Sequence, residues 1–495
     1  SIYYVNTPDF VACHVPAYLW KFDILKGIKK GGTFLLNSIW DEEETKNKLP
    51  DSIKKTLAEK EIDFYIINAT SIAEEIGLGN RTNSIMQSAF FKVSEVIPYN
   101  SSIKEMKELI QKTYGIKGEK IVKMNWAAVD RGDDVNRIDV PVEWKDLKPE
   151  VREKREAVPE FVRDVADRIN RLEGDQVPVS AFVGREDGSF PAGTTQYEKR
   201  GIAVNVPEWI PENCIQCNQC AYVCPHAVIR PFLLTDEELK NAPEGTETVE
   251  GIGGVKGYHY KIQVSVLDCT GCSNCADICP SKEKALVMKP FETQDAEIER
   301  WNYMDLKVGY KENVVPKDKT VKNSQFAKPL FEFSGACPGC GETPYIKMIT
   351  QLYGDRMMIA NATGCSSIYG GTAPSSSYCT NDKGHGPAWA NSLFEDNAEY
   401  AFGMAKGVSK LRNRIALKMK KALNDHISNA AKDVFKEWID NKDNAEGSRI
   451  ASEKVLEVLK DEKSSVAKEI LDLKQYLVKK SVWAFGGDGW AYDIG

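Results

Sequence analysis

Short apolar segments alternate with amphipathic segments over the first 150 residues. Segments rich in β-branched and aromatic residues predict strands, and segments with apolar residues every three or four positions predict helices. This alternation is typical of a doubly wound α/β domain. The predicted strands are Ile2–Val5, Thr33–Asn37, Phe64–Asn68 and Lys120–Met124, and the predicted helices are Asp51–Lys60, Thr82–Val96 and Ser102–Tyr114, with Asp51 and Ser101 or Ser102 as N-caps.

The pattern changes further along the chain. Residues 144–175 mix charges of both signs with prolines, which predicts a helical linker with solvated faces. Residues 176–210 are rich in turn formers, and Tyr260–Leu267 predicts a strand within a cysteine-rich region. Residues 398–475 have a helical period, and Ser481–Phe485 predicts a strand that leads into a glycine-rich turn.

Length and charge narrow the possible functions. At about 150 residues per domain, 495 residues predict three or four domains. Lys and Arg number 65 against 72 Asp and Glu, and a chain of net charge −7 is a poor candidate for a general nucleic-acid binder. No apolar run approaches the length of a membrane span. Both ends look cut, so we expect this chain to be the middle of a longer polypeptide.

Cysteines supply the most specific chemistry. The chain has 13 Cys and only 5 His, and eight of the cysteines form two runs of the type Cys-x2-Cys-x2-Cys-x3-Cys-Pro. In this bacterial ferredoxin spacing, three cysteines hold one cluster and the fourth reaches the other cluster. We therefore assign Cys214, Cys217, Cys220 and Cys279 to one 4Fe–4S cluster, and Cys269, Cys272, Cys275 and Cys224 to a second one.

Zinc is the alternative metal for these cysteines, because Cys-x2-Cys pairs are common in zinc sites. Duplicated runs of four cysteines, each followed by proline, do not match the spacing of zinc ribbons, so iron–sulfur clusters are favoured. Two such clusters predict one-electron transfer in a reducing compartment.

Three further cysteines leave two interpretations open. Cys337 and Cys340 flank a Pro-Gly turn, and Cys365 follows a Thr-Gly pair. They predict either a third cluster that lacks one ligand or a redox-active dithiol at Cys337 and Cys340. Cys13 and Cys379 are expected to be buried small residues.

Two glycine-rich turns are candidate phosphate sites. Gly77–Asn80 precedes a predicted helix, whose N-terminus offers free N–H donors, but an ordinary turn explains it better. Gly487, Asp488 and Gly489 follow a predicted strand, where ligands of open α/β sheets bind. Asp488 supplies a hard oxygen ligand for Mg²⁺, although a plain turn explains Gly-Asp-Gly about as well.

Taken together, these residues resemble the single-chain pyruvate:ferredoxin oxidoreductase family. Any one motif is moderate support, whereas their order along the whole chain is strong support. Besides the double cysteine run, the resemblance rests on Ala336–Glu342, Thr363–Gly370, His385–Glu399 and Gly487–Asp493.

The resemblance implies a site for thiamine diphosphate. Cys337, Cys340 and Cys365 would hold a third, proximal 4Fe–4S cluster, and Asp488 would bind Mg²⁺ within a motif that includes Gly487, Gly489 and Trp490. Glu342 and Cys365 would lie near the cofactor and are our catalytic candidates. Asn83 and Asn125 are candidate contacts for coenzyme A.

The implied domains are a CoA-associated α/β domain over residues 1–150, a charged linker domain over 151–192, a ferredoxin-like domain over 193–312, and part of a thiamine-diphosphate-binding α/β domain over 313–495. The implied reaction converts pyruvate and CoA to acetyl-CoA and CO₂ and passes electrons through three clusters to ferredoxin or flavodoxin. The family also implies a homodimer in anaerobic cytoplasm, with no membrane or nucleic-acid partner.

Two alternatives remain. The substrate is expected to be selected outside this chain, so another 2-oxoacid, either 2-oxoglutarate or an aryl pyruvate, is the first alternative. A non-catalytic electron-transfer subunit would have two clusters only and would bind no thiamine diphosphate.

Overall fold

The computed structural model describes residues 5–149, 157–372 and 374–494. The chain divides into two compact units, Ser1–Ala157 with Asn170–Gly174, and Val158–Ile169 with Asp175–Gly495. The domain boundary predicted at residue 150 lies near the end of the first unit. The boundaries predicted at 192 and 312 lie inside the second unit and stay predictions.

The first unit is built on a four-stranded sheet. Strands β1 (Phe10–Cys13), β2 (Thr33–Asn37) and β3 (Asp63–Ile67) are parallel, and β4 (Asn136–Ile138) pairs antiparallel with β3. The strands follow one another in sequence order across the sheet, so these four strands contain no point at which the order reverses. The helices are α1 (Tyr18–Lys21), α2 (Glu42–Lys48), α3 (Asp51–Glu59), α4 (Ala69–Ile76), α5 (Asn83–Ser94), α6 (Tyr99–Tyr114) and α7 (Glu119–Asp130).

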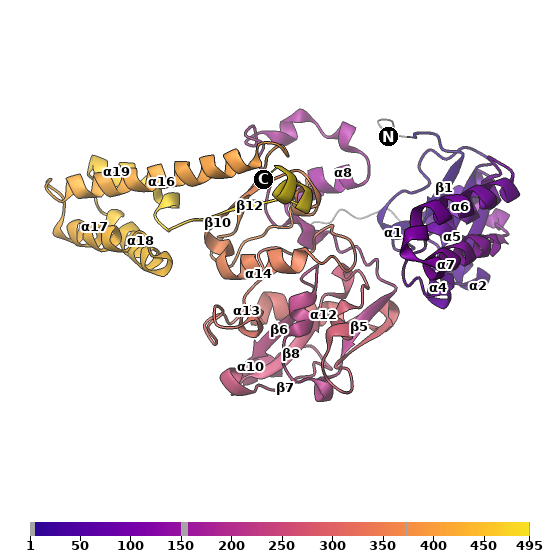
Figure 1. The fold of residues 1–495 in the computed structure, drawn as a ribbon, viewed down its shortest axis with the longest axis horizontal. Coiled ribbons are helices and arrows are strands. Elements are labelled where there is room, and N and C mark those ends of the chain that lie inside the picture. The colour runs from indigo at the N-terminus through magenta and orange to yellow at the C-terminus, as the bar shows by residue number, and fades with distance from the viewer. Residues whose placement is uncertain (1–4, 150–156, 373, 495) are drawn as a thin grey trace. The chain divides into compact units, whose positions relative to one another are not determined.

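Helices cover both faces of this sheet, as Figure 1 shows. Alternate residues of a strand point to opposite faces. Phe34 and Leu36 of β2 accordingly pack with α3, whereas Leu35 packs with α4, α5 and α7. The α/β class predicted for this region is therefore confirmed, with helices on both faces, but the sequential strand order lacks the reversal that defines the predicted doubly wound sheet.

Several predicted elements of the first unit differ from the structure. The segment Lys120–Met124 is part of helix α7, because a five-residue apolar window is too short to distinguish the two periods. Pro50 occupies the N-cap of α3 and Pro98 that of α6, so the predicted caps Asp51, Ser101 and Ser102 are helical residues. The predicted strand Ile2–Val5 lies outside the described residues except for Val5, which belongs to no strand.

The second unit begins with two small sheets that surround the cysteine runs. Strand β5 (Asn205–Trp209) pairs antiparallel with β9 (Leu286–Pro290), and β6 (Ile229–Leu234) and β7 (Val249–Glu250) flank β8 (His259–Val264). The predicted strand Tyr260–Leu267 corresponds to β8. The helices of this part are α8 (Asp167–Asn170), α9 (Gln219–Val223), α10 (Asp236–Lys240), α11 (Asn274–Ile278), α12 (Ala296–Tyr303) and α13 (Val321–Ser324).

A three-stranded parallel sheet follows. Strand β10 (Met357–Asn361) lies between β11 (Ala388–Asn391) and β12 (Ser481–Phe485), the last with the predicted bounds. The predicted helical region 398–475 is a bundle around Phe435 and Trp438 (Figure 1). The helices are α14 (Thr343–Tyr353), α15 (Cys365–Gly370), α16 (Asn397–Ala422), α17 (Asn429–Asn441), α18 (Ala445–Leu459) and α19 (Ser465–Leu471).

A buried ion pair links β6 to the segment that precedes α14. The guanidinium of Arg230 bonds to the carboxylate of Glu332, and both side chains are almost fully buried. The Arg230 guanidinium also lies 4.9 Å from the ring centroid of Trp301. The pair therefore joins the cysteine-rich part to the part that follows it.

Replacing Arg230 by alanine should lower the free energy of unfolding by about 3–5 kcal/mol, because Glu332 would be left buried without its partner. Chemical denaturation curves measure this loss. The exposed pair Lys454–Glu437 provides a matched control, and Lys454→Ala should cost about 0–1 kcal/mol. Equal losses in the two variants would contradict the prediction.

Candidate functional site

The two cysteine runs fold into loops with the same backbone conformation. Gln216 and Asn218 of the first run have φ of 57° and 60°, and Gly271 and Ser273 at the matching positions of the second have 69° and 65°. Each loop then enters a short helix, α9 or α11. Left-handed residues between the cysteines turn the chain sharply. Such turns allow three thiols of a run to face one point.

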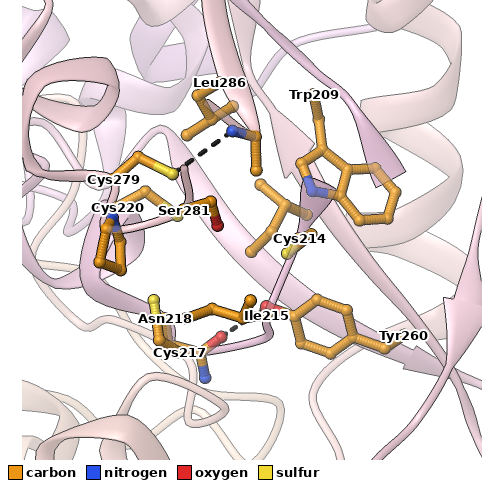
Figure 2. A pocket seen from close by; sticks show the side chains of 13 residues that line it. Trp209, Cys214, Ile215, Cys217, Asn218, Cys220, Tyr260, Cys279, Ser281 and Leu286 are labelled. Atoms are coloured by element: carbon orange, nitrogen blue, oxygen red, sulfur yellow. Dashed lines mark hydrogen bonds between the residues drawn. The ribbon is translucent and has the colours of Figure 1, made fainter. Parts of the chain in front are cut away.

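Cysteines from both runs line one pocket. Figure 2 shows Cys214, Cys217 and Cys220 around a common space with Cys279 of the second run. Its other walls are mainly apolar and include Trp209 and Tyr260. The structure thus brings together the four cysteines that we assigned to one cluster.

The other four cysteines also lie close to one another. Burial raises the pKa of the Cys269 thiol to about 12, and the neighbouring Cys224 and Cys272 add to this effect. Burial likewise raises the pKa of Cys275, again with Cys224 among its neighbours. Cys224 of the first run therefore faces the cysteines of the second run, as the crossed assignment requires. Binding to iron would deprotonate such thiols.

Backbone donors reach two of these sulfur atoms. The Gly271 N–H donates to Cys269 Sγ and the Ala285 N–H to Cys279 Sγ, both at 3.4 Å. Burial opposes ionisation of Cys279, but donation from Ala285 and Ser281 outweighs it and lowers the pKa of this thiol. Such donors stabilise sulfur that bears negative charge.

The described residues contain no ready-made site for a single metal ion. Within residues 5–149, 157–372 and 374–494, no three His, Cys, Asp or Glu side chains lie close enough together to hold one ion. Zinc holds four sulfur ligands about 2.3 Å from one centre. The duplicated four-cysteine spacing is the feature that favours iron–sulfur clusters over zinc.

The turn between Cys337 and Cys340 packs against the second cysteine run. A Cβ atom added to Gly339 would lie 3.8 Å from Cys272 Cβ and 3.6 Å from Asn274 Oδ1. The Gly339 backbone N–H also acts as a donor to Cys272 and lowers the pKa of that thiol, against the larger effect of burial. The candidate proximal site is therefore adjacent to the site formed with Cys272.

His226 joins these two loops. Its Nε2 lies 2.9 Å from the Ala336 carbonyl oxygen and its Nδ1 lies 3.4 Å from the Thr270 hydroxyl. Burial lowers the pKa of His226 to about 4, so the ring is neutral near pH 7. Nε2 then donates to the carbonyl, and Nδ1 accepts from Thr270.

The carboxyl ends of three parallel strands bring the remaining candidates to one sheet edge. In register, Asn361 of β10 lies beside Asn391 of β11 and Phe485 of β12. Cys365 begins α15 shortly after β10, and Asp488 is exposed just after β12. Ligands of open α/β sheets bind at this kind of edge. Cys365 and Asp488 therefore share the predicted location.

Glu342 lies near α15 as well. It occupies the N-cap of α14, and it raises the pKa of Tyr369 in α15, after the larger effect of burial. Cys340 acts on Tyr369 in the same direction. Helix α15, which starts with Cys365, is thus close to both Cys340 and Glu342. Among the thiols, Cys337 and Cys365 are exposed and Cys340 is partly buried.

The candidate CoA contacts lie in the first unit. Asn83 is exposed at the first position of α5. Asn125 is half-buried in α7, and its Nδ2 donates to the Ile121 carbonyl oxygen of the same helix at 2.9 Å. The turn Gly77–Asn80 follows α4, and Gly77 ends that helix with φ of 86°. It connects α4 to α5, and its interpretation as an ordinary turn stays a prediction.

Sequence reasoning gave no role to two buried basic residues beside the cysteines. His226 follows Cys224 by two positions, and this closeness to a cysteine run was a usable signal. Lys347 left no such signal, because its neighbours Ala221 and Tyr222 are more than a hundred positions away. Cys13 and Cys379 are buried, as we predicted.

Family models match three regions of the chain. Residues 213–283 match the 4Fe-4S dicluster domain, so this region is a ferredoxin-like part with the ligands of iron–sulfur clusters. Residues 1–135 match the pyruvate ferredoxin/flavodoxin oxidoreductase model. Residues 147–203 match a domain of unknown function and overlap the predicted linker domain.

Curated relatives align with the whole chain. A pyruvate:ferredoxin oxidoreductase of Moorella thermoacetica is 52% identical and a pyruvate-flavodoxin oxidoreductase of Enterobacter agglomerans is 51% identical, each over 100% of this chain. The chain spans 43% of the length of both. A mitochondrial pyruvate dehydrogenase [NADP(+)] of Euglena gracilis is 41% identical, and the chain spans 27% of it.

Over its whole length the chain is similar to members of the pyruvate:ferredoxin and pyruvate-flavodoxin oxidoreductase family. The resemblance stated from the motifs is therefore confirmed. In the part of the chain that the structure describes, no helix has both the length and the apolar character needed to cross a bilayer.

Proposed function

We propose that this chain is part of an enzyme that oxidises pyruvate with CoA to acetyl-CoA and CO₂ and passes the electrons to ferredoxin or flavodoxin. In this proposal the chain supplies the electron path and one side of a thiamine diphosphate site. The observation that supports it best is the contact between the Cys337–Cys340 turn and Cys272, because a third group of thiols beside the second cysteine run suits a continuous electron path.

The residues present fit three iron–sulfur clusters in part. The two crossed sets of four thiols match the donor set of 4Fe–4S clusters. Cys337, Cys340 and Cys365 would provide three ligands of the proximal cluster, with a fourth from elsewhere. Their exposure suits a site that another segment completes.

The residues near Asp488 fit a thiamine diphosphate site. A Cβ on Gly487 would meet no atom within 4 Å, so a diphosphate has room to approach the backbone. The Asp488 carboxylate accepts from the Gly489 N–H and remains exposed as a ligand for Mg²⁺. The indole N–H of Trp490 is buried without a hydrogen-bond partner among the described residues, so it is free to donate to a bound group.

In this mechanism the residues of the chain bind and orient the cofactor and its Mg²⁺ ion. When bound, thiamine diphosphate supplies the carbanion chemistry that releases CO₂ from pyruvate. Asp488 would hold Mg²⁺ beside the diphosphate and so help to orient the cofactor. Cys365 lies at the same sheet edge and would be a ligand of the cluster that accepts electrons there. Cys337 and Cys340 would be ligands of the same cluster, next to the site formed with Cys272.

The remaining assignments belong to the same proposal. The first unit would contact CoA, and exposed Asn83 is better placed for this than Asn125, whose amide group is already bonded to its own helix. A homodimer in a reducing cytoplasm follows from the family. A different 2-oxoacid remains the second candidate substrate. The relatives are longer than this chain, and the residues that select the substrate are expected outside it.

The test is an assay of the intact protein under argon for CoA-dependent viologen reduction, with pyruvate and separately with 2-oxoglutarate. Reduction with pyruvate, bound thiamine diphosphate and three clusters would support the proposal. Two clusters without thiamine diphosphate would show a non-catalytic electron-transfer subunit. Viologen reduction with 2-oxoglutarate but not with pyruvate would show that 2-oxoglutarate, and not pyruvate, is the substrate.

Replacing Asp488 by asparagine should weaken binding of Mg²⁺ and thiamine diphosphate by at least about tenfold, because even residues that only support a metal ligand contribute about 10–100-fold. The measurement is cofactor titration followed by intrinsic fluorescence. Asp461→Asn changes an exposed carboxylate between α18 and α19 and should leave the affinity unchanged. Unaltered binding in Asp488→Asn would remove Asp488 from the proposed site.

A further inference from the structure

Lys347 is a buried cation beside the cysteine runs. It lies in the middle of α14, and only 2% of the residue is exposed. Helix α14 packs against α9, the helix that connects Cys220 with Cys224. These two cysteines belong to different cluster sites in the crossed arrangement. The ammonium group of Lys347 is therefore near one ligand of each cluster.

The hydrogen bonds of Lys347 go to the backbone of α9. Its Nζ donates to the carbonyl oxygens of Ala221 and Tyr222, the latter at 3.0 Å. Within the described residues, no carboxylate lies within ion-pair distance of Nζ. Arg230, a buried cation whose charge acts on Lys347, has Glu332 as its partner. Lys347 thus has bound carbonyls but no anionic side chain to balance its charge.

A buried ammonium without an anion is costly, and such a lysine tends to lose its proton. Burial does lower the pKa of Lys347 to about 8, whereas the thiols of Cys224 and Cys220 favour its charged form. Those two cysteines would be thiolates in a loaded cluster. Four thiolates give a 4Fe–4S cluster a net negative charge, which grows by one on reduction. The negative charge of the two clusters would therefore balance the positive charge of Lys347.

We propose that Lys347 is a positioning residue that provides a fixed counter-charge to both ferredoxin-type clusters and raises their reduction potentials. The inference rests on the proposed function only in requiring clusters at the two cysteine runs. Each cluster takes up one electron from its neighbour and gives it to the next. Lys347 keeps its proton throughout, and its charge stabilises whichever cluster is reduced.

The test is a redox titration of the intact protein, followed by cluster-resolved EPR, in four variants. Lys347→Met and Lys347→Gln remove the charge at similar length, and Lys347→Arg keeps it. The matched control is Arg412→Met. Arg412 is also a buried cation held by backbone carbonyls, including that of Leu477 at 2.7 Å, but Asp443 and no cysteine acts on it.

In the two neutral variants, both cluster potentials should become more negative. We expect at least a tenfold fall in the equilibrium constant for reduction, which is about 59 mV for a one-electron couple. Lys347→Arg and Arg412→Met should stay near the parent values. Unchanged potentials in cluster-replete Lys347→Met or Lys347→Gln would overturn the inference.

Iron analysis separates the remaining outcomes. If the parent protein itself lacks iron at the two runs, the proposed function fails. If both neutral variants lose this iron while Lys347→Arg keeps it, the charge is needed to hold the clusters, which supports the inference. If Lys347→Arg loses the iron as well, Lys347 acts through its shape, and the inference is wrong.

Discussion

Replacing Cys365 by alanine should abolish pyruvate-dependent viologen reduction in the intact protein and leave both ferredoxin-type clusters in place. Cys365 begins α15 at the sheet edge where Asp488 also lies, apart from both cysteine runs. A cluster that loses one of its thiolates loses iron, and electrons then have no acceptor beside the cofactor. The binding of thiamine diphosphate depends on Asp488 and should persist.

Cluster-resolved EPR and a viologen assay, made on the same sample, measure both effects. Cys379→Ala is the matched control, because Cys379 is also outside the runs but is buried against the Pro329 carbonyl oxygen. It should retain turnover and all clusters. Loss of a ferredoxin-type signal in Cys365→Ala would show that Cys365 binds one of those clusters, and full turnover would exclude it from the electron path.

Local chemistry in the sequence was enough to predict much of the candidate site. The spacing of the cysteine runs predicts which thiols meet, because the ligand geometry of the cluster restricts that spacing. Cys279 accordingly lines the pocket of the first run. Strand β12 has the predicted bounds and places Asp488 at the sheet edge, since β-branched and aromatic residues end there at two glycines.

Contacts between distant segments could not be predicted in this way. The contact of Gly339 with Cys272 depends on how the segment before α14 folds back onto the earlier sheets. The environment of Lys347 depends on the same packing, because a single buried lysine on an apolar helix face gives no periodic signal. The sequential order of the first sheet was likewise hidden, since alternation of strands and helices is compatible with several strand orders.

The crossed ligand sets lead to a prediction with a counterintuitive direction. Cys224 lies in the first run, but Cys224→Ala should destroy the cluster held by Cys269, Cys272 and Cys275. Four of the eight irons at the two runs should be lost, because each 4Fe–4S cluster contributes four. Electron transfer from the proximal site should then stop, since the lost cluster is the one beside the Cys337–Cys340 turn.

Comparison of EPR spectra identifies which cluster is lost. The spectrum of Cys224→Ala should match that of Cys275→Ala, and the spectrum of Cys279→Ala should match that of Cys214→Ala. Cys279→Ala is the matched control, because it is the equivalent change in the other run. It should spare the cluster held by Cys269, Cys272 and Cys275. If Cys224→Ala instead matched Cys214→Ala, each run would hold its own cluster. The electron path would then reach Cys272 through a cluster bound entirely within the second run.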